Sequence, residues 1–154
     1  MKVAVIGTRR VPDTIASHML AYLPAGTTEL VSGGAEGVDR AAEEIAASLS
    51  LPIRRFLPDY ERYGRRAPLM RNLEIVQYAD EVLAFWDGAS RGTMHSIAEC
   101  IRLGRPVRVI PLNVLYPSFP LPPPGNGSDA PPAASSHTSE RLEHKSNERS
   151  KREN

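Results

Sequence analysis

The stretch Glu29-Leu-Val-Ser-Gly-Gly-Ala-Glu-Gly-Val-Asp39 decides the fold that we expect. Its apolar beginning is typical of a short buried strand that ends at Ser32, and the glycines after it predict a tight loop. From Val38 to Ser50 apolar side chains recur at spacings of three and four, which predicts an amphipathic helix that Pro52 ends. A strand, a glycine loop and a helix in this order are the unit from which parallel α/β sheets are built.

The same unit recurs through the first 112 residues. Strands are predicted at 2–7, 29–32, 53–57, 81–86 and 106–110, and helices at 12–22, 38–50, 68–79 and 93–103. Two arginines interrupt the strand at 53–57, which favours an edge position, and the segment 58–67 is predicted as a surface loop. Short links between strands and helices predict a doubly wound α/β fold, with a mostly parallel five-stranded sheet and helices on both faces.

The composition separates this domain from a tail. Eight of the 14 prolines lie between Pro111 and Pro132, and Leu142 is the one strongly apolar side chain after Leu121. Such a segment buries too little apolar area to offset the entropy of ordering, so residues 113–154 are predicted to be a disordered, Pro/Ser-rich, charged tail. We therefore expect one compact α/β domain at 1–112, followed by this tail.

Charge and cysteine content limit the function classes. The net charge is +1, from 19 basic and 18 acidic residues, so the bulk attraction of a strongly basic protein for nucleic acid is not expected. The single Cys100 excludes an internal disulfide, and neither His18 nor His95 has a companion at ligand spacing, so we expect no metal and no cofactor. The apolar run Val3–Ile6 is too short for a signal segment or a membrane span, which predicts a cytoplasmic protein without membrane contact.

Three strand ends carry residues suited to an anion. In parallel sheets ligands bind where the strands end and the strand order reverses. Glycines let backbone amides approach a phosphate, and a helix N-terminus adds partial positive charge, so the segment Ser32–Asp39 has the features of a phosphate site. Ser90-Arg-Gly-Thr93 repeats this arrangement, and Gly7-Thr-Arg-Arg10 adds guanidinium groups, of which we expect Arg10 to be solvated. Tight turns without a ligand are the structural alternative.

Two further positions draw attention. Arg71 and Asn72 fall in the first turn of their predicted helix, where a cation opposes the helix dipole, which indicates either a salt bridge or a functional role. Trp86 ends a buried strand, where it can pack at the rim or stack on a base. No Ser–His–Asp arrangement is evident, and the weak candidates for a catalytic acid are Asp39, Asp87 and Glu99.

Several motifs of this sequence agree in order and spacing with the motifs of one superfamily. They are Ile6-Gly-Thr-Arg9, Val31-Ser-Gly-Gly-Ala-Glu-Gly-Val-Asp39, Tyr63-Gly, Arg71-Asn72, Ala84-Phe-Trp-Asp-Gly88, Ser90-Arg-Gly-Thr93 and Gly104-Arg-Pro-Val107. Residues 1–112 thereby resemble the SLOG superfamily, in particular its YspA/YpsA-related branch, and the tail has no counterpart. The resemblance implies a Rossmann-like fold that binds nucleotides or nucleotide-derived ligands, and makes a homodimer an expectation. Its distant branches include the LOG phosphoribohydrolases and the DNA-processing protein A group, which binds single-stranded DNA.

The resemblance also implies roles for single residues. Arg71 stands where LOG enzymes use an arginine near their substrate, and Gly92-Thr93 resembles their phosphate turn. LOG enzymes have acidic residues after that turn, whereas this chain has Met94, His95 and Ser96, which lowers the case for glycosidase chemistry. The ligand-binding residues that we expect are Gly7, Thr8, Arg9, Ser32, Gly33, Gly34, Gly37, Asp39, Arg71, Asn72, Trp86, Ser90, Gly92 and Thr93.

Our leading hypothesis is the binding of a nucleotide-like small molecule at the carboxyl edge of the sheet, as a sensor or signalling accessory. The first alternative is a nucleoside 5′-monophosphate N-glycosidase, a phosphoribohydrolase, so the sequence leaves open whether the protein is an enzyme. The second alternative is single-stranded DNA binding, although the near-neutral charge and the lack of an aromatic row lead us not to expect nucleic acid as a partner.

Overall fold

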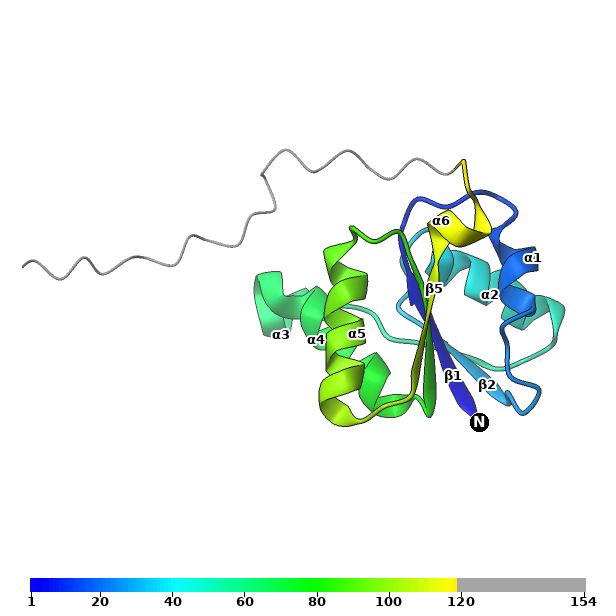
Figure 1. The fold of residues 1–154 in the computed structure, drawn as a ribbon. Helices are drawn as coiled ribbons and strands as arrows, with labels where there is room; N and C mark the ends of the chain where they lie inside the picture. The colour runs from blue at the N-terminus through cyan, green and yellow to red at the C-terminus, as the bar shows by residue number, and fades with distance from the viewer. Residues whose placement is uncertain (119–154) are drawn as a thin grey trace, which may run out of the picture. The chain divides into compact units, whose positions relative to one another are not determined.

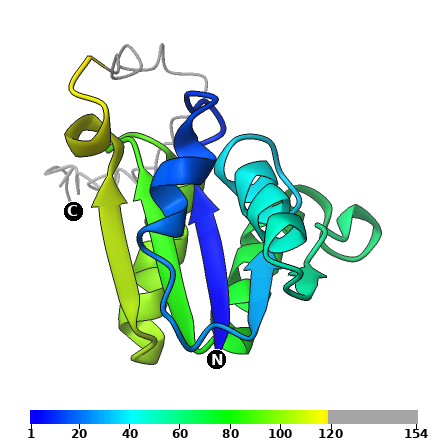
Figure 2. The same cartoon turned by 90° about the vertical axis from the view of Figure 1, so that its right-hand side faces the viewer.

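Five parallel strands form one sheet in the order β3-β2-β1-β4-β5. They are β1 (Lys2–Gly7), β2 (Glu29–Ser32), β3 (Ile53–Arg55), β4 (Glu81–Trp86) and β5 (Val107–Pro111). The computed structural model describes residues 1–118, and Figures 1 and 2 show the strands side by side with their arrows in one direction. The predicted five-stranded parallel sheet is confirmed, and β3 lies at its edge, as its two arginines indicate.

Helices cover both faces of this sheet, as predicted for a doubly wound, Rossmann-like α/β fold. Buried side chains of α1 (Ile15–Leu20) and α2 (Val38–Ser48) pack on one face, and those of α4 (Ala67–Tyr78) and α5 (Arg91–Leu103) pack on the other. Figure 2 shows the first pair in front of the sheet and the second pair behind it. Each strand therefore lies between two apolar layers, which explains why β1 and β4 read as continuous apolar runs.

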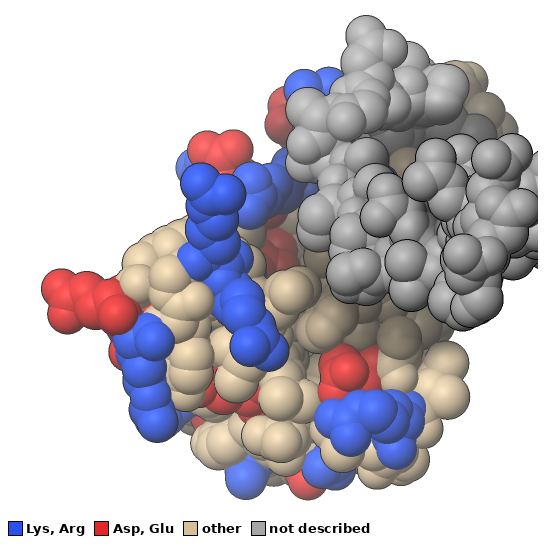
Figure 3. Space-filling model, turned by 90° about the vertical axis from the view of Figure 1, so that its left-hand side faces the viewer, with Lys and Arg blue, Asp and Glu red and all other residues tan. Residues whose placement is uncertain are grey.

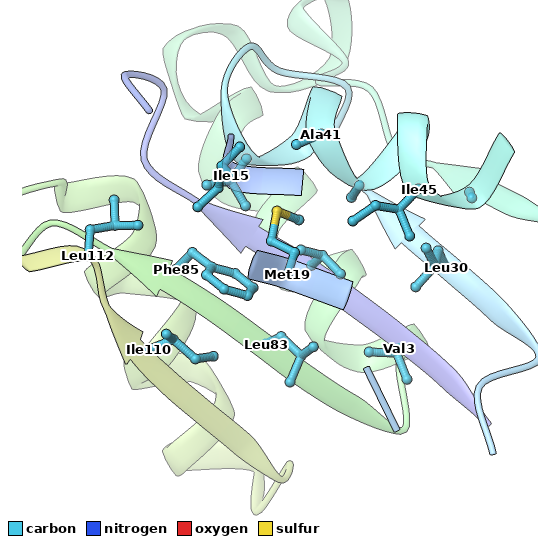
Figure 4. Packing of buried hydrophobic residues seen from close by; sticks show 14 residues of the cluster. Val3, Ile15, Met19, Leu30, Ala41, Ile45, Leu83, Phe85, Ile110 and Leu112 are labelled. Atoms are coloured by element: carbon cyan, nitrogen blue, oxygen red, sulfur yellow. The ribbon is translucent and has the colours of Figure 1, made fainter. Parts of the chain in front are cut away.

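The alternation of side chains along β1 assigns residues to the two layers. Val3 and Val5 belong to the cluster with α1 and α2, whereas Ala4 and Ile6 belong to the cluster with α4 and α5. Figure 4 shows the first cluster, in which Phe85 and Leu83 of β4 lie beside Met19 of α1. Small residues such as Ala4 on the second face let α4 and α5 approach the sheet closely.

The segment predicted as a surface loop is helical. It contains α3 (Tyr60–Tyr63) and the 3₁₀ helix η1 (Gly64–Arg66), which leads directly into α4. The carboxylate of Asp59 accepts a hydrogen bond from the backbone amide of Arg62 at 2.9 Å and caps α3. These elements are short and exposed, so they carry no apolar period, and the prediction of a loop was wrong because capping rather than burial defines them.

The chain continues as helix α6 (Leu112–Leu115) after β5, across the predicted domain boundary. Leu112 is fully buried in the cluster that also holds Ile110 and Phe85. Residues 119–154, which hold most of the predicted tail, lie outside the described residues, so the division into domain and tail stays a prediction. None of the helices in the described part of the chain has the length and apolar character needed to cross a membrane.

Cys100 lies in the second apolar layer with no exposed surface. Burial raises the pKa of its thiol to about 11, because the thiolate would lose its hydration. The thiol therefore stays protonated near neutral pH and acts as a small core residue.

Candidate functional site

The carboxyl ends of β1, β2 and β4 meet at one edge of the sheet, where the strand order reverses between β1 and β4. Thr8 lies at this point and is buried. Its carbonyl oxygen accepts a hydrogen bond from the amide of Val38 at 3.2 Å, and its hydroxyl accepts one from the amide of Asp87 at 3.2 Å. Thr8 therefore joins the loops that lead into α2 and α5, and these loops form one surface.

The glycines after β2 pack tightly against the neighbouring loop. Gly37 has a φ of +77°, and a Cβ atom there would lie 2.3 Å from the carbonyl oxygen of Arg9. Gly34 also has a positive φ, and its amide donates to the hydroxyl of Ser32 at 3.0 Å. Only glycine combines this backbone conformation with so close an approach, which explains the sequence pattern.

Arg71 reaches from α4 to this glycine loop. One of its terminal nitrogens donates to the carbonyl oxygen of Gly33, and its Nε donates to Oδ1 of Asn72 at 3.0 Å. Nδ2 of Asn72 in turn donates to the carbonyl oxygen of Gly92 at 3.4 Å. Because α4 begins at Ala67, Arg71 lies in its second turn and not in the first, so the predicted conflict with the helix dipole is weaker than expected. Its position is explained by its contact with the loop.

Asp39 also lies beside Gly33, next to Arg71. Its Oδ2 accepts a hydrogen bond from the amide of Ala35 at 3.3 Å, and Asp39 as a whole is 6% exposed. Burial raises the pKa of Asp39, while hydrogen bonds and the nearby guanidinium of Arg71 act in the opposite direction. Burial lowers the pKa of Arg71, because it disfavours the charged guanidinium, and the nearby charge of Asp39 partly offsets this effect. A cation and an acid are thus held together next to the glycine loop.

The turn before α5 is organised by Asp87. Its Oδ1 accepts hydrogen bonds from the amides of Ala89 at 2.9 Å and Ser90 at 2.7 Å. The indole Nε1 of Trp86 donates to the carbonyl oxygen of Ser90 at 3.0 Å, and the hydroxyls of Ser90 and Thr93 lie 3.1 Å apart. No side chain among the described residues caps α5, so its first-turn amides face the shared edge.

The three candidate acids differ in their surroundings. Asp39 is next to Arg71, and Asp87 is engaged in its own turn. Glu99 lies about 12 Å further along α5 than Arg91, as the helical rise implies, and it accepts a hydrogen bond from Arg102 at 2.9 Å. The structure therefore does not bring Glu99 together with the other predicted site residues, and the N-glycosidase activity stays a prediction.

The sequence analysis missed two residues at this edge. The side chain of Leu57 lies 2.8 Å from the position that a Cβ atom of Gly34 would occupy. Tyr60 of α3 is 60% exposed, and its electrostatic interaction with Arg71 raises the pKa of that guanidinium, which burial lowers. The available signal was Asp59, a helix-capping residue placed directly before Tyr60.

Comparison with solved structures finds a match to DNA processing protein A from Helicobacter pylori, in a study of its single-stranded DNA binding mode. The match has a TM-score of 0.58 at 25% identity and covers 72% of this chain and 65% of that one. That protein is a SLOG member, so this chain has a distant SLOG-like relationship. The match also contradicts our expectation that nucleic acid is not a partner: a near-neutral net charge does not decide what one surface of this fold binds.

Comparison with family models finds no match. The Gene 61 protein of Mycobacterium phage D29 is 37% identical to this chain over 84 residues, which make up 51% of this chain and 67% of that protein. With this identity over that share of the phage protein, the chain belongs to the same family as the Gene 61 protein of Mycobacterium phage D29.

Proposed function

We propose that this protein is a cytoplasmic binding protein for a nucleotide or nucleotide-derived ligand, and that it acts as a sensor or signalling accessory like the YspA-related proteins that its motifs resemble. The observation that carries this proposal is the chain of hydrogen bonds from Gly33 through Arg71 and Asn72 to Gly92. It joins two strand-end loops around a guanidinium group at the point where α/β sheets bind their ligands.

The chemistry favours a phosphate group near the start of α5. The amides of Gly34 and Ala35 already donate within the glycine loop, to Ser32 and Asp39. The first-turn amides of α5 are available instead, and they lie beside Asn72, which contacts Gly92. Amides at a helix N-terminus and a nearby guanidinium both stabilise a phosphate, the second through paired charged hydrogen bonds.

Thermal-shift measurements with nucleoside mono- and diphosphates, ADP-ribose, cyclic ADP-ribose isomers and NAD test this proposal. A ligand at ten times its Kd stabilises the native state by about 1.4 kcal/mol, which raises the Tm of a domain of this size by roughly 5 °C. We expect Arg71→Lys, which keeps the charge but not the planar fork, to reduce the shift. Arg102→Ala, in the last turn of α5, should leave it unchanged. If no nucleotide raises the Tm of the wild-type protein, the proposal is wrong.

Single-stranded DNA is a second candidate ligand, favoured by the likeness to the Helicobacter pylori protein. A strand would use the same phosphate contacts repeatedly, so its affinity would fall with salt by a slope of about 0.7 per phosphate contact on a logarithmic plot. Fluorescence anisotropy of a labelled twelve-residue oligothymidylate, measured between about 50 and 200 mM salt, tests this candidate. A flat titration at the lowest salt concentration would rule it out.

A further inference from the structure

Five arginine side chains make no hydrogen bond, ion pair or ring contact with any other residue of the described part of the chain. By contrast, Arg40, Arg55, Arg102 and Arg108 each pair with a carboxylate. The five unpaired side chains lie in the loop after β1, in η1 and at the start of α5, which all border the carboxyl edge of the sheet: Arg9, Arg10, Arg65, Arg66 and Arg91. A single solvated arginine is common on a protein surface, but these five all lie at one edge of the sheet.

Two of them stand where a cation is locally unfavourable. Arg66 occupies the N-cap position of α4, directly after Arg65, and the first turn of this twelve-residue helix contains no acidic residue. Helix N-termini favour Ser, Asp or a negative charge, because the dipole is positive there. A residue that is disfavoured at its local position often has a role that the stability of the fold does not explain, such as binding an anion.

The elements α3 and η1 are fixed beside the candidate site. Asp59 caps α3, and Gly64, with a φ of +53°, turns the chain from α3 into η1. The guanidinium of Arg62 lies 5.0 Å from the ring of Tyr63, so this cation also belongs to the segment. Tyr60 begins α3, and its electrostatic interaction with Arg71 of α4 raises the pKa of that guanidinium. Figure 3 faces the side on which α3 lies in Figure 1 and shows basic side chains gathered there.

We propose that α3 and η1 form a second anion-binding element, in which Arg65 and Arg66 hold the second phosphate of a ligand that carries two or more phosphate groups. This inference rests on the proposed function, because it takes the first phosphate to lie near Arg71. The exposed ring of Tyr60 then offers a face for a base or sugar between the two phosphates. Two phosphates on either side of a base or sugar occur both in a free dinucleotide and in two consecutive nucleotides of a single strand.

The test compares ligands that carry one phosphate with ligands of the same base that carry two. The four 5′-deoxynucleoside monophosphates and the matching 5′-phosphorylated homodinucleotides are titrated into the full chain, followed by isothermal calorimetry. The variant R65A/R66A is compared with wild type and with R102A/R108A, which removes two exposed arginines that pair with carboxylates elsewhere. Circular dichroism checks that each variant is folded.

We expect R65A/R66A to weaken dinucleotide binding roughly five- to thirtyfold, because exposed charge pairs contribute little each. Monophosphate binding should change less than about twofold, and R102A/R108A should bind both ligands like wild type. Equal losses for both ligands, or no loss for the dinucleotide, would overturn the second element while leaving the proposed function standing. If wild type binds none of these ligands, the second element is wrong, and the thermal-shift measurements with the wider set of nucleotides decide the proposed function.

A longer probe separates the two sources of the ligand. If an oligothymidylate of twelve residues binds more tightly than the dinucleotide, and R65A/R66A lowers the slope of its salt dependence by about 0.7, as the loss of one phosphate contact requires, the element follows a strand. If length adds nothing, the ligand is a free molecule with two phosphates. Tyr60→Phe should retain binding of the base, whereas Tyr60→Ala should weaken binding of every nucleotide tested.

Discussion

At the scale of single residues, the three glycines after β2 serve different purposes. Gly34 and Gly37 have positive φ angles, which other residues adopt only with strain. Gly33 has an ordinary φ, but an added Cβ atom would lie 2.6 Å from Nη1 of Arg71 and 2.8 Å from Oδ2 of Asp39. Gly33 is therefore required by its neighbours, and this distinction is invisible in the sequence Ser-Gly-Gly.

We predict that Gly33→Ala displaces Arg71 and weakens nucleotide binding more than tenfold, because a guanidinium–phosphate pair contributes roughly 1.5–3 kcal/mol. Crowding should lower the free energy of unfolding by about 1–3 kcal/mol. Gly26→Ala is the control, since a Cβ atom at Gly26 meets nothing within 4 Å. Calorimetric titration and urea unfolding measure both effects, and wild-type affinity in Gly33→Ala would contradict the assigned role.

The buried carboxyl of Asp39 predicts a pH dependence of stability. Burial raises its pKa in the folded protein, so the folded state binds this proton more tightly than the unfolded chain does. The resulting stabilisation is complete below the ordinary pKa of 3.8 and is lost as the pH rises through the folded value. Asp39→Asn removes the titration, so its free energy of unfolding relative to wild type should increase from pH 3.5 to pH 7. Urea unfolding of both proteins at each pH checks this, and a difference that stays constant from pH 3.5 to pH 7 would contradict it.

At the scale of elements, helices and strands with a buried face follow the sequence closely. The predicted helix at 38–50 is observed as Val38–Ser48, and the strand at 81–86 is observed with the same bounds. Both contain apolar residues in the period that their burial demands. The short elements α3, η1 and α6 were missed, because four or fewer residues give no measurable period: α3 is defined by its local cap, and α6 is anchored by the burial of Leu112.

Helix α6 gives a prediction for this scale. Leu112 begins the helix with no exposed surface, whereas Val114 in the same helix is 68% exposed. Leu112→Ala should lower the free energy of unfolding by about 2–5 kcal/mol, because it leaves a cavity beside Phe85 and Ile110. Val114→Ala should change it by less than about 0.5 kcal/mol. Urea denaturation compares the two, and equal effects would mean that α6 is not part of the folded unit.

At the scale of the whole molecule, one sheet is shared by two apolar layers, so neither layer can unfold alone. We predict a single cooperative unfolding transition, in which the fluorescence of Trp86 and the far-ultraviolet circular dichroism coincide. Phe85→Ala should destabilise the protein by about 3–5 kcal/mol and shift both signals together. Val109→Ala, a partly exposed position of β5, is the milder control. Two separate transitions in wild type would contradict this account.

The distribution of charge is also a property of the whole molecule. The net charge of +1 led us not to expect nucleic acid, because the sum does not reveal which arginines are neutralised by neighbours. Among the residues that the structure describes, four arginines pair with carboxylates, while five unpaired ones collect at the edge that holds the candidate site. A ligand responds to this local field and not to the total.

The sequence by itself determined the parallel sheet, the helices on both faces and the loops that carry the candidate site. It could do so because burial imposes a period on the residues of each long element, and glycine marks turns that other residues cannot form. Only the tertiary structure decided that Arg71 reaches Gly33, that Asn72 joins Arg71 to Gly92, and that Glu99 pairs with Arg102 away from the other candidate residues. The contacts with Gly33 and Gly92 join residues far apart in the chain, whose distances are fixed by how the helices pack on the sheet and not by any local pattern.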